Sequence, residues 1–367
     1  MIRFRAAICA ALLVLAGCGT GTSADRMEPR RYTDIAEDES IVFFRTAGSL
    51  DTEASAWQLR IHGWVFEPED SSFRRGVAEE VLKRKYGLTV DDGSEPVFSR
   101  RINWLITDNE RGKTVFVRIG ERDYEMPPSD THGKFESVVS LPAAEAEALA
   151  VDGRIGFSAM TAGPSVRRFD GVVTLVPPSG VSVISDIDDT VKLSMITDRA
   201  KLLEYAVLRE FEPAPGMPAL YSDWSREGAR FHYVSSSPWQ LYPELDEFLA
   251  VAGLPADSLH LKRVRFRDET LFDLFAKGED TKPAQIAPIL ARWPERTFVL
   301  VGDSGEHDPE VYAELLRRHP EQVRRVYIRN VTGARPDDDR FGALFDGIDA
   351  ERWALFDDPA SLHLPAD

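Results

Sequence analysis

The chain has 367 residues, a length for which two domains are the natural expectation, and its 43% hydrophobic and 29% charged content is that of an ordinary globular protein, which argues against a disordered or polytopic one. The formal net charge of −17 argues against a broad nucleic-acid-binding surface. The same charge would repel anionic bilayers unless local basic clusters offset it.

The first residues have the pattern of a targeting segment. Arg3 and Arg5 form a short positive stretch, and the apolar run from Ala6 to Ala16 is too short to span a bilayer as a mature helix. Small residues then lead directly into Cys18. No later apolar run is long enough to cross a membrane, so we expect a soluble body tethered by its first mature residue.

This start resembles a bacterial lipoprotein signal. The resemblance implies removal of residues 1–17, acylation of Cys18 and a lipidated tether over 18–31, and the alternative is a secretory signal with an incidental cysteine. Because Cys9 lies in the removed part, Cys18 is left as a lone thiol that cannot form an internal disulfide. Gly19 gives no retention signal of the Asp type, so we expect a lipoprotein of the cell envelope, in the outer membrane and facing the periplasm.

Residues 32–178 have a mainly β pattern. Short segments rich in β-branched and aromatic residues predict strands at 41–44, 57–66, 102–106, 114–119, 135–141 and 172–176. One helix is predicted over Phe73–Tyr86, with Gly87 as its stop. The turns favour a small β-sandwich or barrel. His62 and His132 are interpreted as structural, and we find no catalytic constellation here.

A change of pattern at residues 177–180, which are rich in Pro and Gly, marks a domain boundary. From 181 to 360, predicted strands at 181–185, 230–235, 259–264, 297–302 and 324–328 alternate with predicted helices at 217–227, 242–252, 283–293 and 309–319. Such alternation predicts a parallel sheet covered on both faces, a Rossmann-like α/β domain that follows the smaller mainly-β domain. In such a sheet, the residues that bind ligands and react with them lie at the carboxyl ends of the strands.

The first two of these strands end in polar groups. Asp186 and Asp188 follow the first strand, with Thr190 behind them, and carboxylates this crowded need a cation or a shared proton. The second strand runs into Ser235 and Ser236 just before a helix start, where free backbone N–H groups can face an anion. The alternative for these serines is helix capping, which uses the same donors.

Two further groups lie near later strand ends. Lys282 stands just before a predicted helix and competes with Lys277 for the role of the phosphate-facing cation. Asp303 ends another apolar strand. Asp308 precedes Pro309, and it is either a carboxylate of the metal shell or the N-cap of a helix.

Taken in order, these groups resemble the four motifs of the haloacid dehalogenase superfamily, which are Asp186-x-Asp188-x-Thr190, Ser235, Lys282 and Gly302-Asp303-x4-Asp308. More narrowly, Asp-Ile-Asp-Asp-Thr followed by Tyr-Val-Ser-Ser-Ser-Pro-Trp-Gln resembles the actin-patch-associated phosphatidate phosphatase family, over about residues 180 to 357. Lipins carry a similar first motif with Gly where Asp189 stands, which leaves the role of Asp189 open.

The resemblance implies a role for each group. Asp186 would attack phosphorus and form an aspartyl phosphate, and Asp188 would act as general acid and then as general base. Mg²⁺ would be held by Asp186, the backbone carbonyl of Asp188 and Asp303, with Asp308 as the open fourth candidate. The phosphate-binding groups would be the side chains and amides of Thr190, Ser235, Ser236 and Lys282.

We therefore expect a Mg²⁺-dependent phosphatase that converts phosphatidate to diacylglycerol and phosphate. The alternatives are a phosphatase of another phosphomonoester (a sugar, nucleotide or phosphoprotein) and a tethered non-catalytic binding module. The expected partners are a phospholipid or other phosphomonoester and a membrane reached through the anchor, with no nucleic acid. Trp239, Phe266, Phe272 and Phe275 are either core residues or a lipid-facing mouth, and the basic run from Lys262 to Arg267 either meets anionic headgroups or protects an edge strand.

Overall fold

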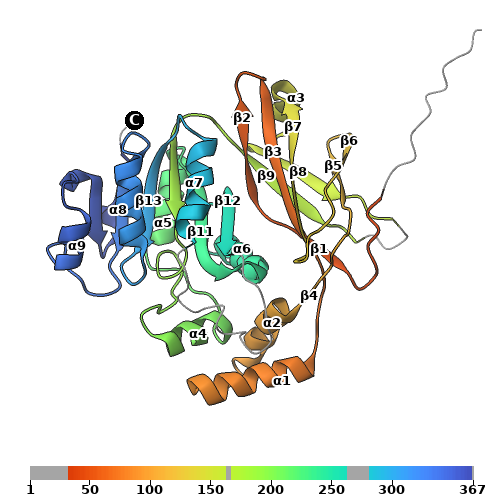
Figure 1. Ribbon diagram of the computed structural model, residues 1–367, viewed down its shortest axis with the longest axis horizontal. Helices are drawn as coiled ribbons and strands as arrows, with labels where there is room; N and C mark the ends of the chain where they lie inside the picture. The colour runs from red at the N-terminus through yellow and green to blue at the C-terminus, as the bar shows by residue number, and fades with distance from the viewer. Residues whose placement is uncertain (1–31, 163–166, 263–280, 366–367) are drawn as a thin grey trace, which may run out of the picture. The chain divides into compact units, whose positions relative to one another are not determined.

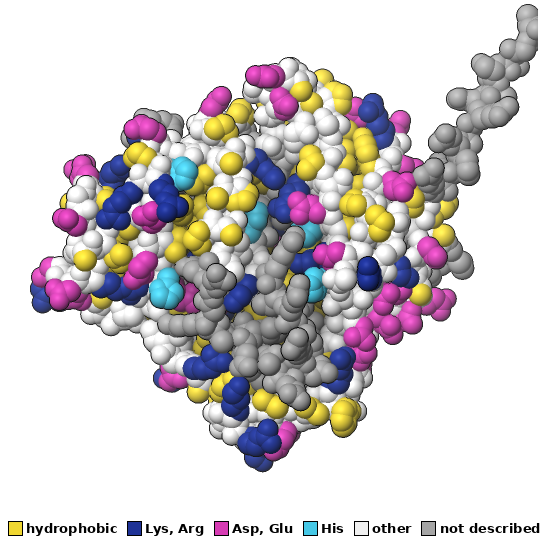
Figure 2. Space-filling model, viewed as in Figure 1, with side chains coloured by type: hydrophobic (Ala, Val, Ile, Leu, Met, Phe, Trp, Pro, Cys, Tyr) yellow, Lys and Arg dark blue, Asp and Glu magenta, His cyan; other side chains and the backbone are white. Residues whose placement is uncertain are grey.

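The strands of the protein are divided between two sheets (Figure 1). The computed structural model describes residues 32–162, 167–262 and 281–365. Residues from Tyr32 onward form one compact unit. Acidic and basic side chains are interspersed over the face shown in Figure 2, with hydrophobic side chains between them. Within the described ranges, no helix is long and apolar enough to cross a bilayer.

The first sheet is mostly antiparallel and has nine strands. They are β1 (Ser40–Phe43), β2 (Thr46–Asp51), β3 (Ala56–Glu67), β4 (Asp108–Asn109), β5 (Phe116–Ile119), β6 (Arg122–Glu125), β7 (Lys134–Pro142), β8 (Arg154–Ala159) and β9 (Asp170–Val176). Strand β3 pairs with β1, β2 and β7. Val117 of β5 and Phe135 of β7 share one hydrophobic core although their strands lie at opposite ends of the sheet, so the sheet curves around that core.

Whether residues 32–178 form a separate domain stays a prediction. Its aromatic residues Phe44, Trp64 and Phe66 pack in the same hydrophobic core as Phe231 and Tyr233 of the second sheet. Trp64 is fully buried and its ring centroid lies 4.7 Å from that of Trp239. The two sheets therefore share a core as well as having one each.

Helices interrupt the first sheet at two places: α1 (Ser72–Val81) and α2 (Glu95–Ile106) lie between β3 and β4, and α3 (Ala143–Leu149) lies between β7 and β8. The predicted helix over 73–86 is confirmed as α1 and a π-helical turn, which end at Gly87 with a φ of 70°. The predicted strand at 102–106 is wrong, because these residues are the end of α2. Buried residues at 97, 98, 101, 102 and 105 follow the helical period, and Arg101 donates to the carbonyl oxygen of Ala206 at 3.0 Å.

The second sheet is entirely parallel, as predicted. Its strands are β10 (Val181–Ser185), β11 (Arg230–Pro238), β12 (Ser258–Lys262), β13 (Thr297–Asp303), β14 (Val323–Arg329) and β15 (Trp353–Phe356). Their spatial order is β12-β11-β10-β13-β14-β15. Counted along the chain this is 3-2-1-4-5-6, the order of doubly wound Rossmann folds.

Helices cover both faces of this sheet: α4 (Arg199–Val207), α5 (Met217–Arg226), α6 (Tyr242–Val251), α7 (Lys282–Arg292), α8 (Asp308–Arg318) and α9 (Asp339–Leu344). Neighbouring residues of β10 face opposite ways, as the period of a strand requires. Val183 belongs to the core that contains α5 and α6, whereas Ile184 belongs to the core that contains α7 and α8. The strand order reverses between β10 and β13, and in folds of this kind ligands bind beyond the carboxyl ends of the strands at that point.

Candidate active site

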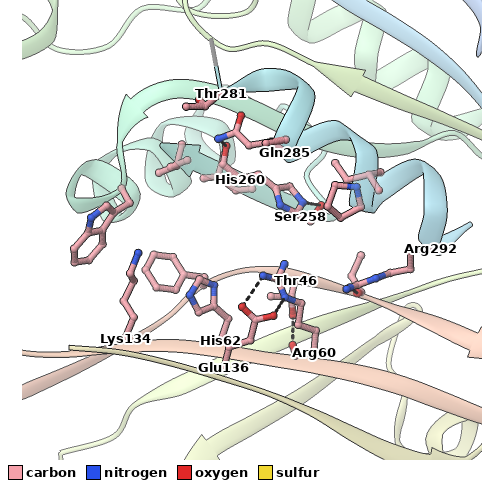
Figure 3. A pocket seen from close by; sticks show the side chains of 18 of the residues that line it. Thr46, Arg60, His62, Lys134, Glu136, Ser258, His260, Thr281, Gln285 and Arg292 are labelled. Atoms are coloured by element: carbon pink, nitrogen blue, oxygen red, sulfur yellow. Dashed lines mark hydrogen bonds and ion pairs between the residues drawn. The ribbon is translucent and has the colours of Figure 1, made fainter. Parts of the chain in front are cut away.

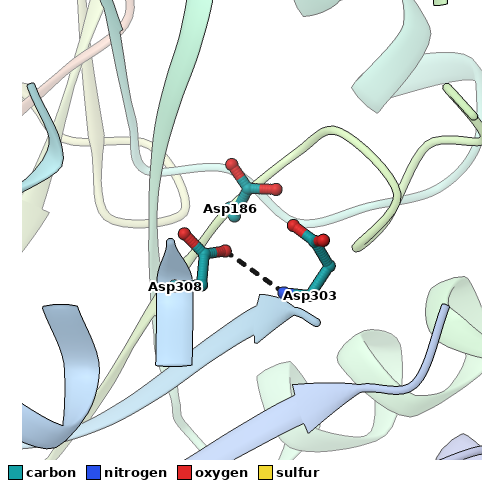
Figure 4. Close-up of side chains that lie close together, drawn as sticks. All are labelled: Asp186, Asp303 and Asp308. Carbon is teal, nitrogen blue, oxygen red and sulfur yellow. Dashed lines mark hydrogen bonds between the residues drawn. The ribbon is translucent and has the colours of Figure 1, made fainter. Parts of the chain in front are cut away.

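Three buried carboxylates meet at this reversal point (Figure 4). Asp186 follows β10, Asp303 is the last residue of β13 and Asp308 is the first residue of α8. One carboxylate oxygen of each lies within 4.8 Å of the others, and the residues are at most 1% exposed. The amide of Asp186 donates to the carbonyl oxygen of Val301 at 2.8 Å, which joins β10 to β13 at the site.

Burial and mutual repulsion act together on these acids. Burial raises the pKa of Asp186 and of Asp303, and the charge of Asp308 raises both further. Lys282 opposes this effect, because its Nζ lies 3.0 Å from Asp186 Oδ1, contacts Asp308 and lies 3.4 Å from Glu306. Burial disfavours the charge of Lys282, but the attraction of Asp186 and Asp308 raises its pKa. One ammonium thus faces several carboxylates.

The centre fits a divalent cation. Asp303 Oδ2 is buried and accepts no hydrogen bond from the described residues, whereas Asp186 Oδ1 is paired with the Lys282 ammonium at 3.0 Å. Buried polar atoms are nearly always satisfied, so the Asp303 oxygen needs a further partner in this cluster. Carboxylate oxygens are the ligands that Mg²⁺ prefers. Asp186, Asp303 and Asp308 are therefore the side chains that could hold it.

Asp308 owes its position to a glycine. Its Oδ2 accepts from the amide of Asp303 at 3.1 Å, and the N-cap residue of α8 is His307. A Cβ atom at Gly302 would lie 2.2 Å from this Oδ2, a separation that no side chain allows. Gly302 therefore lets the start of α8 approach β13 closely enough for Asp308 to reach the carboxylate centre.

Asp188 belongs to a separate polar network. Its Oδ1 lies 2.8 Å from Lys192 Nζ and accepts from the Ser194 hydroxyl at 2.7 Å. Its Oδ2 accepts from the hydroxyls of Ser235 at 3.1 Å and Ser237 at 2.8 Å. Burial by itself would raise the pKa of Asp188, but the charge of Lys192 and these donors lower it to about 2. Asp188 is thus ionised at neutral pH.

The loop after Asp188 is organised by Asp189, whose role the sequence leaves open. Asp189 has a φ of 53°, in the left-handed region that glycine adopts at least cost. Its carboxylate accepts from the amides of Ser194, Met195 and Ile196 at 2.7 to 3.0 Å. These bonds compensate for the backbone conformation and bring Ser194 to Asp188. Nearby, Thr190 Oγ1 donates to Asp186 Oδ2 at 3.1 Å.

The structure brings most of the predicted residues together, either in the carboxylate centre or around Asp188. Ser236 is half-buried in β11 and its side chain forms no hydrogen bond with the described residues. Cys18, Lys277, Phe266, Phe272 and Phe275 lie outside the described residues. Trp239 is only 3% exposed and packs in the core, and it is also one of the residues that line a cavity beside β12.

Sequence reasoning missed three residues of the site. These are Lys192, Ser194 and Glu306. Lys192 stands only two residues beyond the Asp-x-Asp-x-Thr motif, and a lysine so close to crowded carboxylates was the signal that could have found it. Ser194 carries no comparable signal, because its role depends on loop conformation. Ser237 belongs to the serine run 235–237, for which the sequence predicts phosphate binding or helix capping, and its hydroxyl donates to Asp188.

Comparisons with known proteins agree with this geometry. Residues 181–330 match the family described as phosphatidate phosphatase APP1, catalytic domain. The chain is 32% identical over 166 residues to phosphatidate phosphatase APP1 of Saccharomyces cerevisiae, covering 44% of this chain and 28% of that protein. It is 29% identical over 171 residues to an uncharacterized protein of Schizosaccharomyces pombe, covering 45% and 28%. The chain thus spans less than a third of the length of these relatives.

Among solved structures, D,D-heptose 1,7-bisphosphate phosphatase from B. bronchiseptica, complexed with magnesium and phosphate, aligns with 12% identity and a TM-score of 0.29. The alignment covers 49% of this chain and 94% of that one. This likeness is too low to carry an argument, and the family match is the stronger finding. The part of the chain from 181 to 330 is similar to a phosphatase catalytic domain, which makes it a domain of the phosphoric monoester hydrolase kind.

Proposed function

We propose that the protein is a Mg²⁺-dependent phosphatase that hydrolyses a phosphomonoester through an aspartyl phosphate, and that phosphatidate is its substrate. The observation that carries the proposal is the buried group of Asp186, Asp303 and Asp308, with the ionised Asp188 beside it. A site that only bound phosphate would have no use for the second carboxylate, Asp188. Its hydrogen-bonded, ionised state is what a proton-transferring group requires.

In the proposed reaction Asp186 attacks phosphorus and the ester oxygen leaves. Thr190 and Lys282 hold the two oxygens of the Asp186 carboxylate in place. Bound Mg²⁺, held by Asp186, Asp303 and the backbone carbonyl of Asp188, would supply neutralisation of the charge on the phosphoryl group. Asp308 adds a negative charge beside the Lys282 ammonium and is a further candidate ligand of the cation.

Asp188 would serve both half-reactions. It gains a proton when the anionic ester binds beside it, because a neighbouring negative charge raises a carboxyl pKa, and it passes this proton to the leaving oxygen. Once ionised again, it accepts a proton from the water that hydrolyses the aspartyl phosphate. The hydroxyls of Ser235 and Ser237 hold its Oδ2 in position for both steps.

Phosphatidate is favoured over other monoesters by three features. Residues 181–330 are similar to a phosphatidate phosphatase catalytic domain. Between Thr190 and α5 the chain forms only the short helix α4, so no cap domain is inserted there to exclude a large substrate. The N-terminal sequence predicts a lipid anchor on Cys18, which would place the enzyme as a lipoprotein of the bacterial envelope, next to its substrate.

A substrate panel tests the proposal. Phosphate release would be measured from phosphatidate in mixed micelles, a sugar phosphate, a nucleotide and a phosphopeptide, each with Mg²⁺ and with chelator. We expect Mg²⁺-dependent release, fastest from phosphatidate. Preference for another monoester would replace the substrate but keep the reaction, whereas no turnover of any ester would overturn the enzyme proposal.

The Asp188→Asn variant separates the two carboxylate roles. Asparagine keeps the size of the side chain but cannot accept a proton, so turnover should fall by about 10² to 10⁴-fold. Phosphate binding, measured by calorimetry, should remain. Asp223→Asn, at an exposed position of α5, is the matched control and should leave turnover unchanged. Turnover that survives Asp188→Asn would contradict the proton-transfer role.

A further inference from the structure

A cavity of about 540 Å³ lies where the edge of the second sheet meets the first sheet (Figure 3). Strand β12 and helix α7 form one wall, and residues of β2, β3 and β7 form the other. The hydroxyl of Ser235 turns to Asp188, whereas its carbonyl oxygen accepts from Gln285 of the cavity wall at 3.3 Å. The volume is typical of a small-molecule site.

The charged groups of the cavity are mostly cations. Among the described residues, Arg60, Lys134 and Arg292 line it together with one carboxylate, Glu136. Arg60 uses Nε and Nη2 to pair with both oxygens of Glu136, at 2.5 and 2.8 Å. The Lys134 ammonium lies 4.5 Å from the ring centroid of Trp239. The one carboxylate is thus already occupied by Arg60.

Arg292 is the lining cation that forms no ion pair with a carboxylate of the described residues. It is half-buried, and no carboxylate of the described residues lies within 4.0 Å of it. Its polar contact is a long one, 3.4 Å from Nη1 to the carbonyl oxygen of Ala47. Burial lowers the pKa of Arg292, and the charge of Arg60 lowers it further. An anion bound in the cavity would relieve both effects.

The other residues of the cavity wall are hydrogen-bonded to one another or contribute apolar surface. Ser258 is held by two histidines, His232 Nδ1 at 2.8 Å and His260 Nε2 at 3.0 Å. Phe44 and Ile289 contribute apolar surface from opposite sides of the cavity. A ligand that suits this wall carries an anion and some apolar carbon.

We propose that the cavity is a second ligand site, which binds an anionic phosphate ester with adjoining apolar carbon, of the kind found in phosphoglycerol lipids. The phosphate lies at Arg292, and the adjoining carbons contact Phe44, Trp239 and Ile289. This site goes beyond the proposed function, because it requires no metal and no turnover.

Calorimetric titration of the full chain in chelator tests the site without reference to catalysis. The probes are dihexanoyl phosphatidylglycerol and dihexanoyl phosphatidylcholine, each below its micelle concentration, and free glycerol 3-phosphate. We expect phosphatidylglycerol to bind about tenfold more tightly than the choline ester, whose headgroup has no net charge. Equal binding of glycerol 3-phosphate would also support the site and would identify soluble esters as its source. Equal affinity for both lipids, or no binding of any probe, would overturn the proposal.

Variants of Arg292 locate the binding. Arg292→Gln should weaken phosphatidylglycerol binding by about tenfold or more, and Arg292→Lys, which keeps the charge, should weaken it less. Arg318→Gln, on the exposed side of α8, is the matched control and should bind like the unaltered chain. Circular dichroism and thermal unfolding would check that each variant folds. Unchanged affinity in a folded Arg292→Gln variant would contradict the assignment.

Discussion

The carboxylate centre and the cavity beside β12 differ in the sign of their charge. In the centre, Asp186, Asp303 and Asp308 face the single ammonium of Lys282. In the cavity, three cations stand beside one carboxylate, Glu136, among the described residues that line it. Burying like charges together costs several kcal/mol unless an opposite charge joins them. On the two proposals made above, a cation would complete the first place and an anion the second.

The largest effect should come from removing one charge of the centre. Asp303→Asn should lower turnover by about 10³-fold or more, because the cation loses a ligand worth several kcal/mol of charge stabilisation. The same change relieves repulsion, so the variant should unfold at a higher temperature than the unaltered chain when both are in chelator. Phosphate release and thermal unfolding, with Mg²⁺ and with chelator, measure the two effects.

The control for this prediction is the unaltered chain itself. Mg²⁺ should raise its unfolding temperature, because the cation binds the folded state only. It should raise that of Asp303→Asn much less. A chain whose stability is indifferent to both Mg²⁺ and this substitution would contradict the idea that the centre needs a cation.

A smaller effect on turnover is expected when a cation of the site is removed. Lys192→Met should lower kcat by about 10²-fold, because Asp188 loses its charged partner and part of its alignment for proton transfer. Lys192 Nζ lies 4.7 Å from the ring centroid of Phe211, and the methionine sulfur should keep a contact with this ring in place of the ammonium. Lys201→Met, at an exposed position of α4, should have no effect. Equal kcat values for the two variants would remove Lys192 from the mechanism.

The smallest effect concerns the stability of the cavity wall in acid. Burial and the nearby arginines lower the pKa of His260 to about 3, from 6.5 in an unfolded chain. The folded state therefore binds this proton less well than the unfolded state. The contribution of His260 is fully present above pH 6.5 and is lost as the pH falls toward 3.

Replacing this imidazole tests that sign. Between pH 7 and 5 the free energy of unfolding should fall by about 1 to 2 kcal/mol less in His260→Gln than in the unaltered chain. Urea unfolding at several pH values measures the difference. His132→Gln, at a half-buried loop position away from the cavity wall, should keep the full dependence. An identical pH dependence in all three proteins would show that His260 titrates alike in the folded and unfolded states.

An element of the fold can be predicted from the sequence when a short stretch of residues is enough to identify it. The strand β10 was predicted to the residue, because a run of apolar residues between a glycine and carboxylates has few other interpretations. The segment 102–106 was misassigned because five apolar-rich residues fit the end of a helix as well as a strand. The helical pattern of α2 becomes clear only with residues 97 and 98 included.

The same distinction applies to the sites. The residues of the carboxylate centre stand in short motifs at strand ends, so order and spacing reveal them. The walls of the cavity come from β2, β3, β7, β12 and α7, and nothing in the local sequence of Arg60 or Arg292 connects them. Their proximity depends on how the two sheets pack, which periodicity does not encode.

The pairing of β10 with β13 has a consequence for how the chain folds. The amide of Asp186 bonds to Val301, so the carboxylate centre exists only after strands more than a hundred residues apart have joined. Contacts of such long range form slowly, since the loop between them must first lose its freedom. Until then the chain has no assembled carboxylate centre that could bind a metal. Binding of Mg²⁺ during refolding should therefore report the completion of the sheet and lag behind the formation of its helices.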